Sequence, residues 1–218
     1  MKRFKQILLT SAILINLIPL AVLGKNQNPP PEKPKQSTSI LEAVLSLFKS
    51  RERRMMTRGE EVCLISPGNK GEQLIQSDRP IFVWWGQIFE SQINLYHGDK
   101  LVWTKTVPAN SQTIAYDGEP LKSGETYDWE LVSNGQNYRQ TIVLLEEERR
   151  KAIAKESIDL DNRLTTERAT AEEKAIAKAE YFLDKKLSSD ALQQLYSVKN
   201  ASPDLTSQID DFEDRLCK

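Results

Sequence analysis

Hydrophobic and polar positions alternate with a period of two over residues 59–145, in short runs separated by turn residues. In the run TYDWEL, Tyr127, Trp129 and Leu131 are spaced to face a common core, while the acids between them face water. The Asn-Gly dipeptide at 134–135 is a strong signal for a tight hairpin. A series of short strands at this spacing predicts an antiparallel β-sandwich of the immunoglobulin or fibronectin III type.

After residue 145 the hydrophobic period changes to three or four, which predicts helices over 146–218. Thr170 and Glu173 have the spacing of a capping box at the start of one helix. Ser202 and Pro203 mark the start of the last helix. The expected fold class is therefore α+β, with a β-sandwich followed by a C-terminal helical hairpin region that forms an α-helical tail.

The helical region also contains part of the pattern of a tetratricopeptide repeat. The matching residues are Ala179, Phe182, Ala191, Leu195 and Pro203. Lys178 occupies the place of the usual leucine, and a single repeat normally needs neighbours to bury its faces. We therefore expect one helical hairpin, covered either by the helix over 146–168 or by the sandwich.

Residues 1–24 have the pattern of a secretory signal peptide, with Lys2, Arg3 and Lys5 before an almost wholly apolar run that ends at Gly24. The alternative is an uncleaved membrane anchor, because the run approaches the length of a membrane span. Either interpretation places the rest of the chain outside the cytoplasm, in the periplasm or the cell envelope.

Residues 25–58 are read as a proline-rich linker, a short amphipathic helix and a basic neck. The basic residues of the neck are Lys49, Arg51, Arg53, Arg54 and Arg58. Acidic residues outnumber basic ones over the rest of the folded region, which argues against nucleic-acid binding. The neck either contacts an anionic membrane surface beside the amphipathic helix or is a solvated connector.

The chain has two cysteines, Cys63 in a predicted strand and Cys217 in the last predicted helix. An even number of cysteines in an exported chain suggests a disulfide. The alternative is two free thiols packed as small apolar side chains. The spacing along the chain does not decide between them.

The order of four segments resembles a group of exported cyanobacterial proteins of unknown function, which combine an immunoglobulin-like sandwich with a helical, tetratricopeptide-like tail. The segments are RGEEVCLISPGNKGE, DRPIFVWWG, GEPLKSGETYDWEL and AEYFLDKKLSSDALQQLYSV. The resemblance extends over about residues 58–217. It implies an envelope or periplasmic location and brings no catalytic residues.

Aromatic residues in two strands are candidates for a binding surface. Trp84 and Trp85 are adjacent, so they point to opposite faces of a strand, and one of them either marks a partner or sugar surface or is buried under the helices. In the strand that follows the HGD turn, Leu101 and Trp103 are expected to share a face.

The sequence contains no recognisable catalytic set. His97 is the sole histidine, in a predicted hairpin, and a dyad with Asp99 lacks a nucleophile beside it. The loop PGNKGE lacks the spacing of a phosphate-binding loop, and DLDNR lacks that of an EF-hand. We therefore expect no catalytic, cofactor-binding or metal-binding residues.

The expected function is that of an exported, non-enzymatic binding or scaffolding protein of the bacterial cell envelope, with protein partners. The alternative is a membrane-tethered accessory factor that is retained by an uncleaved N-terminal helix. The sequence identifies neither the partner nor the oligomeric state.

Overall fold

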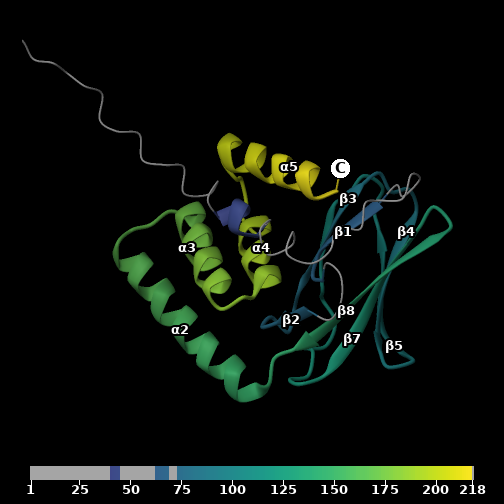
Figure 1. Ribbon diagram of the computed structural model, residues 1–218, viewed down its shortest axis with the longest axis horizontal. Helices are drawn as coiled ribbons and strands as arrows, with labels where there is room; N and C mark the ends of the chain where they lie inside the picture. Colours follow the sequence, from purple (N-terminus) through teal and green to yellow (C-terminus); the bar gives the residue numbers. More distant parts are fainter. Residues whose placement is uncertain (1–39, 45–61, 69–72, 218) are drawn as a thin grey trace, which may run out of the picture. The chain divides into compact units, whose positions relative to one another are not determined.

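The computed structural model describes residues 40–44, 62–68 and 73–217 of the chain. Strands occupy the first part of this region and helices the last part (Figure 1). The strands are β1 (Val62–Ser66), β2 (Gln73–Ile75), β3 (Ile81–Gly86), β4 (Ser91–His97), β5 (Lys100–Val107), β6 (Thr113–Ala115), β7 (Thr126–Ser133) and β8 (Gln136–Leu144). The helices are α2 (Glu147–Thr166), α3 (Ala171–Asp184), α4 (Ser188–Tyr196) and α5 (Pro203–Cys217). This arrangement confirms the α+β class.

Several expectations concern residues outside the described part. These are the signal peptide or anchor at 1–24, the linker, and the basic neck with Lys49, Arg51, Arg53, Arg54 and Arg58. The expected amphipathic helix is described only over 40–44, where the chain is helical and Ile40, Leu41 and Val44 are buried. The interpretations of the neck remain predictions.

The strands form two sheets. One has the order β1-β3-β6 and the other the order β2-β8-β7-β4-β5. β2 runs parallel to β8, which corrects the expectation of a wholly antiparallel arrangement. The physical reason is connectivity: parallel neighbours need a long crossover, and here the chain from β3 to β7 lies between the two strands.

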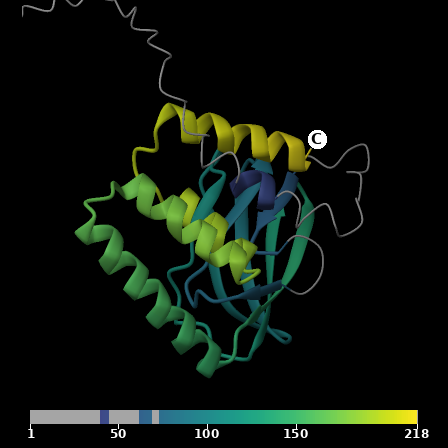
Figure 2. The same cartoon turned by 60° about the vertical axis from the view of Figure 1, so that its left-hand side comes forward.

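Strand β3 is covered on both faces. Phe82 and Trp84 point into an apolar cluster shared by the two sheets, and both are fully buried. Ile81, Val83 and Trp85 point the other way, into a cluster formed with the helices. Figures 1 and 2 show the helices on the side of β1 and β3, away from β5. The adjacent tryptophans therefore face two different cores: Trp84 is fully buried, and Trp85 packs against the helices while remaining partly exposed.

The helices pack around an apolar cluster that lies between them and the sheet. Ala179 and Phe182 of α3 and Ala191 and Leu195 of α4 are all buried in it. Leu205 and Phe212 of α5 belong to the same cluster, which also includes residues of the sheet. The spacing that resembles a tetratricopeptide repeat thus marks the buried faces of α3 and α4.

Local signals in the sequence correspond to local structure. The Thr170 hydroxyl accepts a hydrogen bond from the Glu173 backbone N–H, and the Glu173 carboxylate accepts one from the Thr170 N–H. Asn134 and Gly135 have φ angles of 54° and 74° between β7 and β8, as a tight hairpin turn requires. The capping box and this hairpin are confirmed.

The expectation that Leu101 and Trp103 share a face is wrong. Trp103 pairs with Leu95, and Leu101 pairs with Tyr96, so Val102 is an extra residue between two successive pairs. Such a bulge reverses the alternation of side chains. Leu101 is therefore 46% exposed, while Trp103 packs against the core between the sheets.

We expect Val83→Asp to lower the free energy of unfolding by at least about 3 kcal/mol, because it places an unpaired charge between β3 and the helices. Thr106→Asp, at an exposed position of β5, is the matched control. It should change the free energy of unfolding by no more than about 0.5 kcal/mol. Urea titration followed by tryptophan fluorescence measures both. If both substitutions changed the free energy of unfolding by the same small amount, the helices would not cover β3.

Candidate functional site

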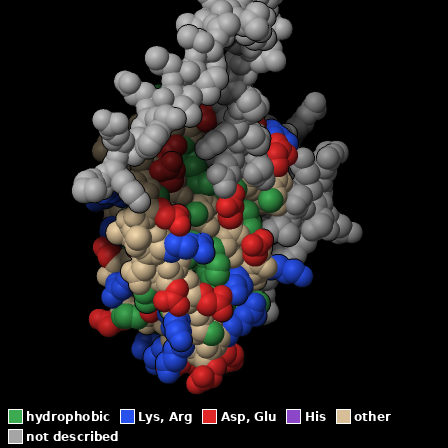
Figure 3. All heavy atoms as spheres, turned by 90° about the vertical axis from the view of Figure 1, so that its left-hand side faces the viewer, with side chains coloured by type: hydrophobic (Ala, Val, Ile, Leu, Met, Phe, Trp, Pro, Cys, Tyr) green, Lys and Arg blue, Asp and Glu red, His purple; other side chains and the backbone are tan. Residues whose placement is uncertain are grey.

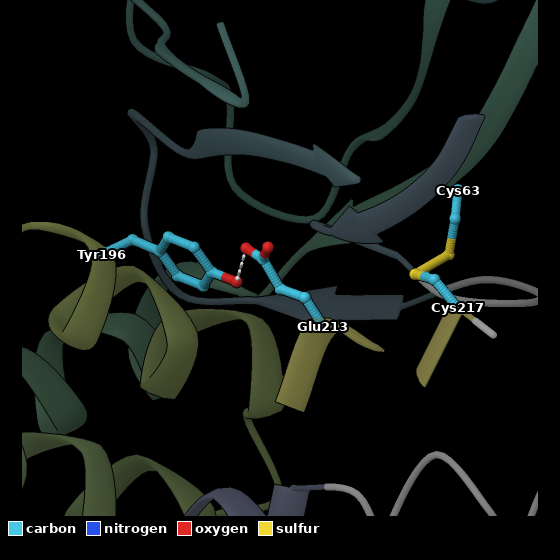
Figure 4. Close-up of a disulfide and its surroundings, with 4 residues drawn as sticks. All are labelled: Cys63, Tyr196, Glu213 and Cys217. Atoms are coloured by element: carbon cyan, nitrogen blue, oxygen red, sulfur yellow. Dashed lines mark hydrogen bonds between the residues drawn. A yellow bond between two sulfur atoms is a disulfide. The ribbon is translucent and has the colours of Figure 1, made fainter. Parts of the chain in front are cut away.

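The two cysteines form a disulfide between the sheet and the last helix. Cys63 lies in β1 and Cys217 ends α5, with 5.8 Å between their Cα atoms and a sequence separation of 154. Figure 4 shows the bond beside the point where α5 meets the strands. The disulfide therefore fastens one end of the helical layer to the sheet that this layer covers.

A partly buried tyrosine and a buried carboxyl group form a hydrogen-bonded pair near the disulfide (Figure 4). The Tyr196 hydroxyl of α4 donates to Glu213 Oε1 of α5 at 2.8 Å. Burial raises the pKa of both groups, and the neighbouring Asp210 adds to the effect on each. The pair joins α4 to α5, and neither residue lines the two clefts described below.

The start of α4 is a polar junction with the strands, which we call the α4 junction. It comprises Gly68, Gln73, Gln76, Ser77, Ser188, Ser189 and Asp190. Ser189 Oγ donates to Gln73 Oε1 at 2.8 Å, and Gln73 Nε2 donates to Ser188 Oγ at 2.5 Å. The Gly68 N–H also donates to Gln73 Oε1, at 2.5 Å. The amide of Gln73 thus joins strand β2 to α4.

Asp190 is the charged member of the α4 junction. Its two carboxyl oxygens accept hydrogen bonds from the backbone N–H groups of Gln76 and Ser77, at 2.9 and 2.8 Å. Only 2% of its surface is exposed, and this burial raises its pKa to about 6 although both hydrogen bonds act to lower it. The first turn of α4 therefore binds the loop between β2 and β3.

Arg150 of α2 reaches the same loop from the other side. Its Nε donates to the Gln76 carbonyl at 3.0 Å, and its guanidinium also contacts Ser123 Oγ at 3.0 Å and Asp78 at 2.9 Å. A cleft of about 240 Å³ lies beside it, lined in part by Glu147 and Lys151. Lys151 is paired with Glu147 at 2.7 Å, so both cations of this cleft already have carboxylate partners.

A second cleft, of about 270 Å³, separates the 40–44 helix from α5. Its cation is Arg215, which pairs with Glu42 across the cleft and with Asp211 on its own helix. Its apolar lining is limited to Leu41 and Phe212. Neither cleft therefore combines an unpaired charge with an apolar wall, as ligand sites commonly do.

The structure does not bring the sequence candidates for catalysis together. His97 Nε2 lies 3.0 Å from Glu125 Oε2, and the His97 ring lies tilted against that of Tyr127, whereas Asp99 is not its hydrogen-bond partner. Cys63 is in the disulfide. Within 40–44, 62–68 and 73–217, no group of three or more His, Cys, Asp or Glu side chains could hold a metal ion.

Sequence reasoning did not find the α4 junction. The only local signal was the run Ser-Ser-Asp at the start of a predicted helix, where such residues commonly stay at the surface as caps. The partner of Asp190 lies 113 residues earlier in the chain. No periodicity connects two positions so far apart.

Phe89 is an exposed aromatic residue on a loop whose backbone is held in place. Its side chain is 60% exposed, between β3 and β4. Ser91 Oγ donates to the Phe89 carbonyl at 3.1 Å, and Asn134 Nδ2 donates to the Gln87 carbonyl at 3.4 Å. The intervening Ile88 is fully buried and accepts from the Asn110 N–H at 3.5 Å. The loop therefore presents an exposed apolar ring on a backbone that three hydrogen bonds hold in place.

The face formed by α2 and α3 carries charges of both signs. Figure 3 looks onto this side, where Lys and Arg side chains alternate with Asp and Glu side chains. Two ion pairs connect the helices, Lys178 with Asp161 at 2.7 Å and Lys185 with Glu156 at 2.5 Å. Mixed charges of this kind produce no strong field of one sign.

Among the residues that the structure describes, no helix is long and apolar enough to cross a membrane. No family model and no curated protein matches the chain. Among solved structures, the chain is similar to extracellular domains 3–5 of Drosophila OTK, with 11% sequence identity and a TM-score of 0.26. The similarity covers 40% of this chain and spans only 37% of that one. A match of this size supports no functional conclusion.

We expect the double variant Cys63→Ser, Cys217→Ser to lose up to about 5 kcal/mol of unfolding free energy, because the bond closes a loop of 154 residues. Guanidinium titration of the oxidised protein and of the variant measures the difference. Dithiothreitol should destabilise the wild type and leave the variant unchanged. A wild type that is equally stable with and without reductant would contradict the expectation.

Proposed function

We propose that this chain is an exported, non-enzymatic binding or scaffolding protein of the bacterial cell envelope. The observation that carries the binding function is Phe89, an aromatic side chain that is 60% exposed on an anchored loop. Aromatic residues, Phe included, are enriched at the centres of protein interfaces. Binding by a preorganised surface requires no reactive group.

The finer description of the fold is part of this proposal. We interpret the two sheets as an immunoglobulin-like or fibronectin III-like sandwich, and α3 with α4 as one tetratricopeptide-like helical hairpin. The shared apolar cluster between the sheets and the buried small residues Ala179 and Ala191 support this interpretation. The resemblance to the exported cyanobacterial group, which rests on segments in the same order, belongs to the same proposal.

The proposed location rests on the Cys63–Cys217 bond. Disulfides persist in oxidising compartments and are rare in the reducing cytosol. An exported protein with this bond would be fully assembled only after reaching such a compartment. The apolar segment at 1–24 provides the export signal in this proposal.

The surroundings of Phe89 indicate the kind of partner. The side-chain amide of Asn134 lies against the Gln87 carbonyl of this loop, and the loop carries a single charge at Glu90. An apolar ring on a loop with few charges fits a protein partner with an apolar pocket and a hydrogen-bonding rim. The partner is therefore expected to lack a strongly charged contact face.

We expect Phe89→Ser to reduce recovery of envelope partners at least about tenfold in a quantitative pull-down, as loss of one aromatic centre of an interface commonly does. Ile158→Ser is the matched control, because Ile158 is also 60% exposed but lies alone on α2. Partners retained by both variants would contradict the role of Phe89. Urea titration of both variants would show that neither change affects folding.

A further inference from the structure

Strand β5 is a long strand at the border of the larger sheet. Among the described strands, β1, β2, β5 and β6 lie at sheet borders, and β5 is the longest of these at eight residues. In Figure 1 it lies on the side of the sheet away from the helices. Within the described part of the chain, the backbone of residues 103–107 pairs with β4 alone, so its outward N–H and C=O groups have no protein partner there. Such an edge is a template for pairing with another strand.

Two exposed apolar side chains lie on the same strand. Leu101 and Val102 are 46% and 41% exposed, at the end of β5 that follows its hairpin with β4. Burial of apolar surface favours association of proteins. A second strand along this edge would therefore be favoured by its backbone hydrogen bonds and by the cover that it gives to this apolar pair.

The features that commonly keep edge strands unpaired leave the second half of β5 open. Bulges and lysines are such features, but the bulge at Val102 precedes the regular stretch of residues 103–107. Lys105 pairs with the buried Ile93, so its side chain lies on the face of the core, where Asp117 binds its ammonium at 2.6 Å. Neither feature blocks the backbone of this stretch.

The alternation of side chains restricts how β5 could pair with a second β5. Thr104 and Thr106 lie on the outer face of the sheet, where the Thr104 hydroxyl donates to Asn94 at 2.8 Å. Trp103 and Lys105 lie on the face of the core. A two-fold axis perpendicular to the sheet keeps both faces continuous only if directly opposite residues share a face. The axis must therefore pass beside a residue and not between two residues.

The lysines select one position of this axis. Beside Lys105, the axis would place that residue opposite its own copy; beside Trp103, it would place Lys100 opposite Lys105, with the bulge counted as one position. Like charges directly opposite each other are destabilising. An axis nearer the end of the strand leaves only a short ladder. An axis beside Thr104 places Trp103 opposite Lys105 and no lysine opposite another.

The axis beside Thr104 also brings opposite charges together. Asp117 accepts hydrogen bonds from Trp103 Nε1 at 2.9 Å and from Lys105 Nζ at 2.6 Å, and its side chain is still 60% exposed. Because Lys105 of each copy would lie opposite Trp103 of the other, it would approach the carboxylate that this indole binds. Near the ends of the ladder, Leu101 of each copy would lie opposite Thr106 of the other. The edge is therefore complementary to itself in charge and covers its own exposed apolar residues.

We propose that two copies of this chain associate through β5, in an antiparallel pairing with the two-fold axis beside Thr104. The outward backbone groups of the two strands bond to each other, and the larger sheet continues across both copies. Because the area of one strand edge is small, the dimer is weak and depends on protein concentration. This contact goes beyond the binding function proposed above and does not use the loop that carries Phe89.

Sedimentation equilibrium of the full-length, oxidised protein at about 1 μM to 1 mM tests the proposal. The wild type should shift from the mass of a monomer toward that of a dimer as concentration rises. Thr104→Lys and Thr104→Asp each place like charges opposite each other at the axis, so each variant alone should associate at least about tenfold more weakly. An equimolar mixture of the two should associate at least about tenfold more tightly than either alone, because lysine then faces aspartate.

Thr126→Lys is the matched control, because Thr126 is an exposed threonine of β7, inside the same sheet. It should associate as the wild type does. A wild type that stays monomeric, or association that Thr104→Lys leaves unchanged, would overturn the proposal. A mixture of the two Thr104 variants that associates no better than its components would exclude the axis beside Thr104.

If the Thr104 variants do not fold, amide hydrogen exchange of the wild type provides the decision. Protection of the outward amides of residues 103–107 should rise with protein concentration, since pairing gives these amides acceptors. Protection that is the same at low and high concentration would exclude the pairing.

Discussion

The structure depends on the burial of strand β3 on both of its faces. Phe82 and Trp84 need the five-stranded sheet on one side, and Val83 and Trp85 need the helices on the other. Removing either cover would expose large apolar side chains to water, at a cost of about 1.5–3 kcal/mol for each one fully exposed. The helices after residue 145 are consequently part of the fold, because they cover one face of β3. They cannot be treated as an appendage that is separable from the strands.

Apolar contacts hold the helical layer on the sheet, and polar contacts at its margins set its position. The hydrophobic effect is non-directional, so the cluster shared by helices and sheet would tolerate sliding. Hydrogen bonds and disulfides have restricted geometry. The bonds of Asp190 at one margin and the Cys63–Cys217 bond at the other therefore specify one arrangement. This division of roles explains why charged and polar groups are buried at a contact that apolar residues already stabilise.

Features that depend on neighbouring residues were predictable, and features that depend on distant ones were not. The capping box of Thr170 and Glu173 and the turn at Asn134 involve residues at most three apart. The bulge at Val102 depends on how β4 and β5 align, which alternation along one strand does not reveal. The α4 junction depends on contacts across more than 110 residues. For the proposed interface, composition identified no candidate loop, because Phe89 resembles any other apolar residue of a strand-rich segment.

The sequence by itself determined the order of strands and helices, the change of period near residue 145, and the set of apolar residues available for a core. These follow from local backbone preferences and from the need to bury every second, or every third or fourth, side chain. Only the tertiary structure decided which elements pack against each face of β3. It also decided that Asp190 is buried and that Phe89 is exposed. The reason is that burial is a property of what packs against a residue. In this chain, the residues that pack on β3 come from other strands and from the helices after residue 145, and the carboxylate that binds the β2–β3 loop is more than 110 residues away in sequence.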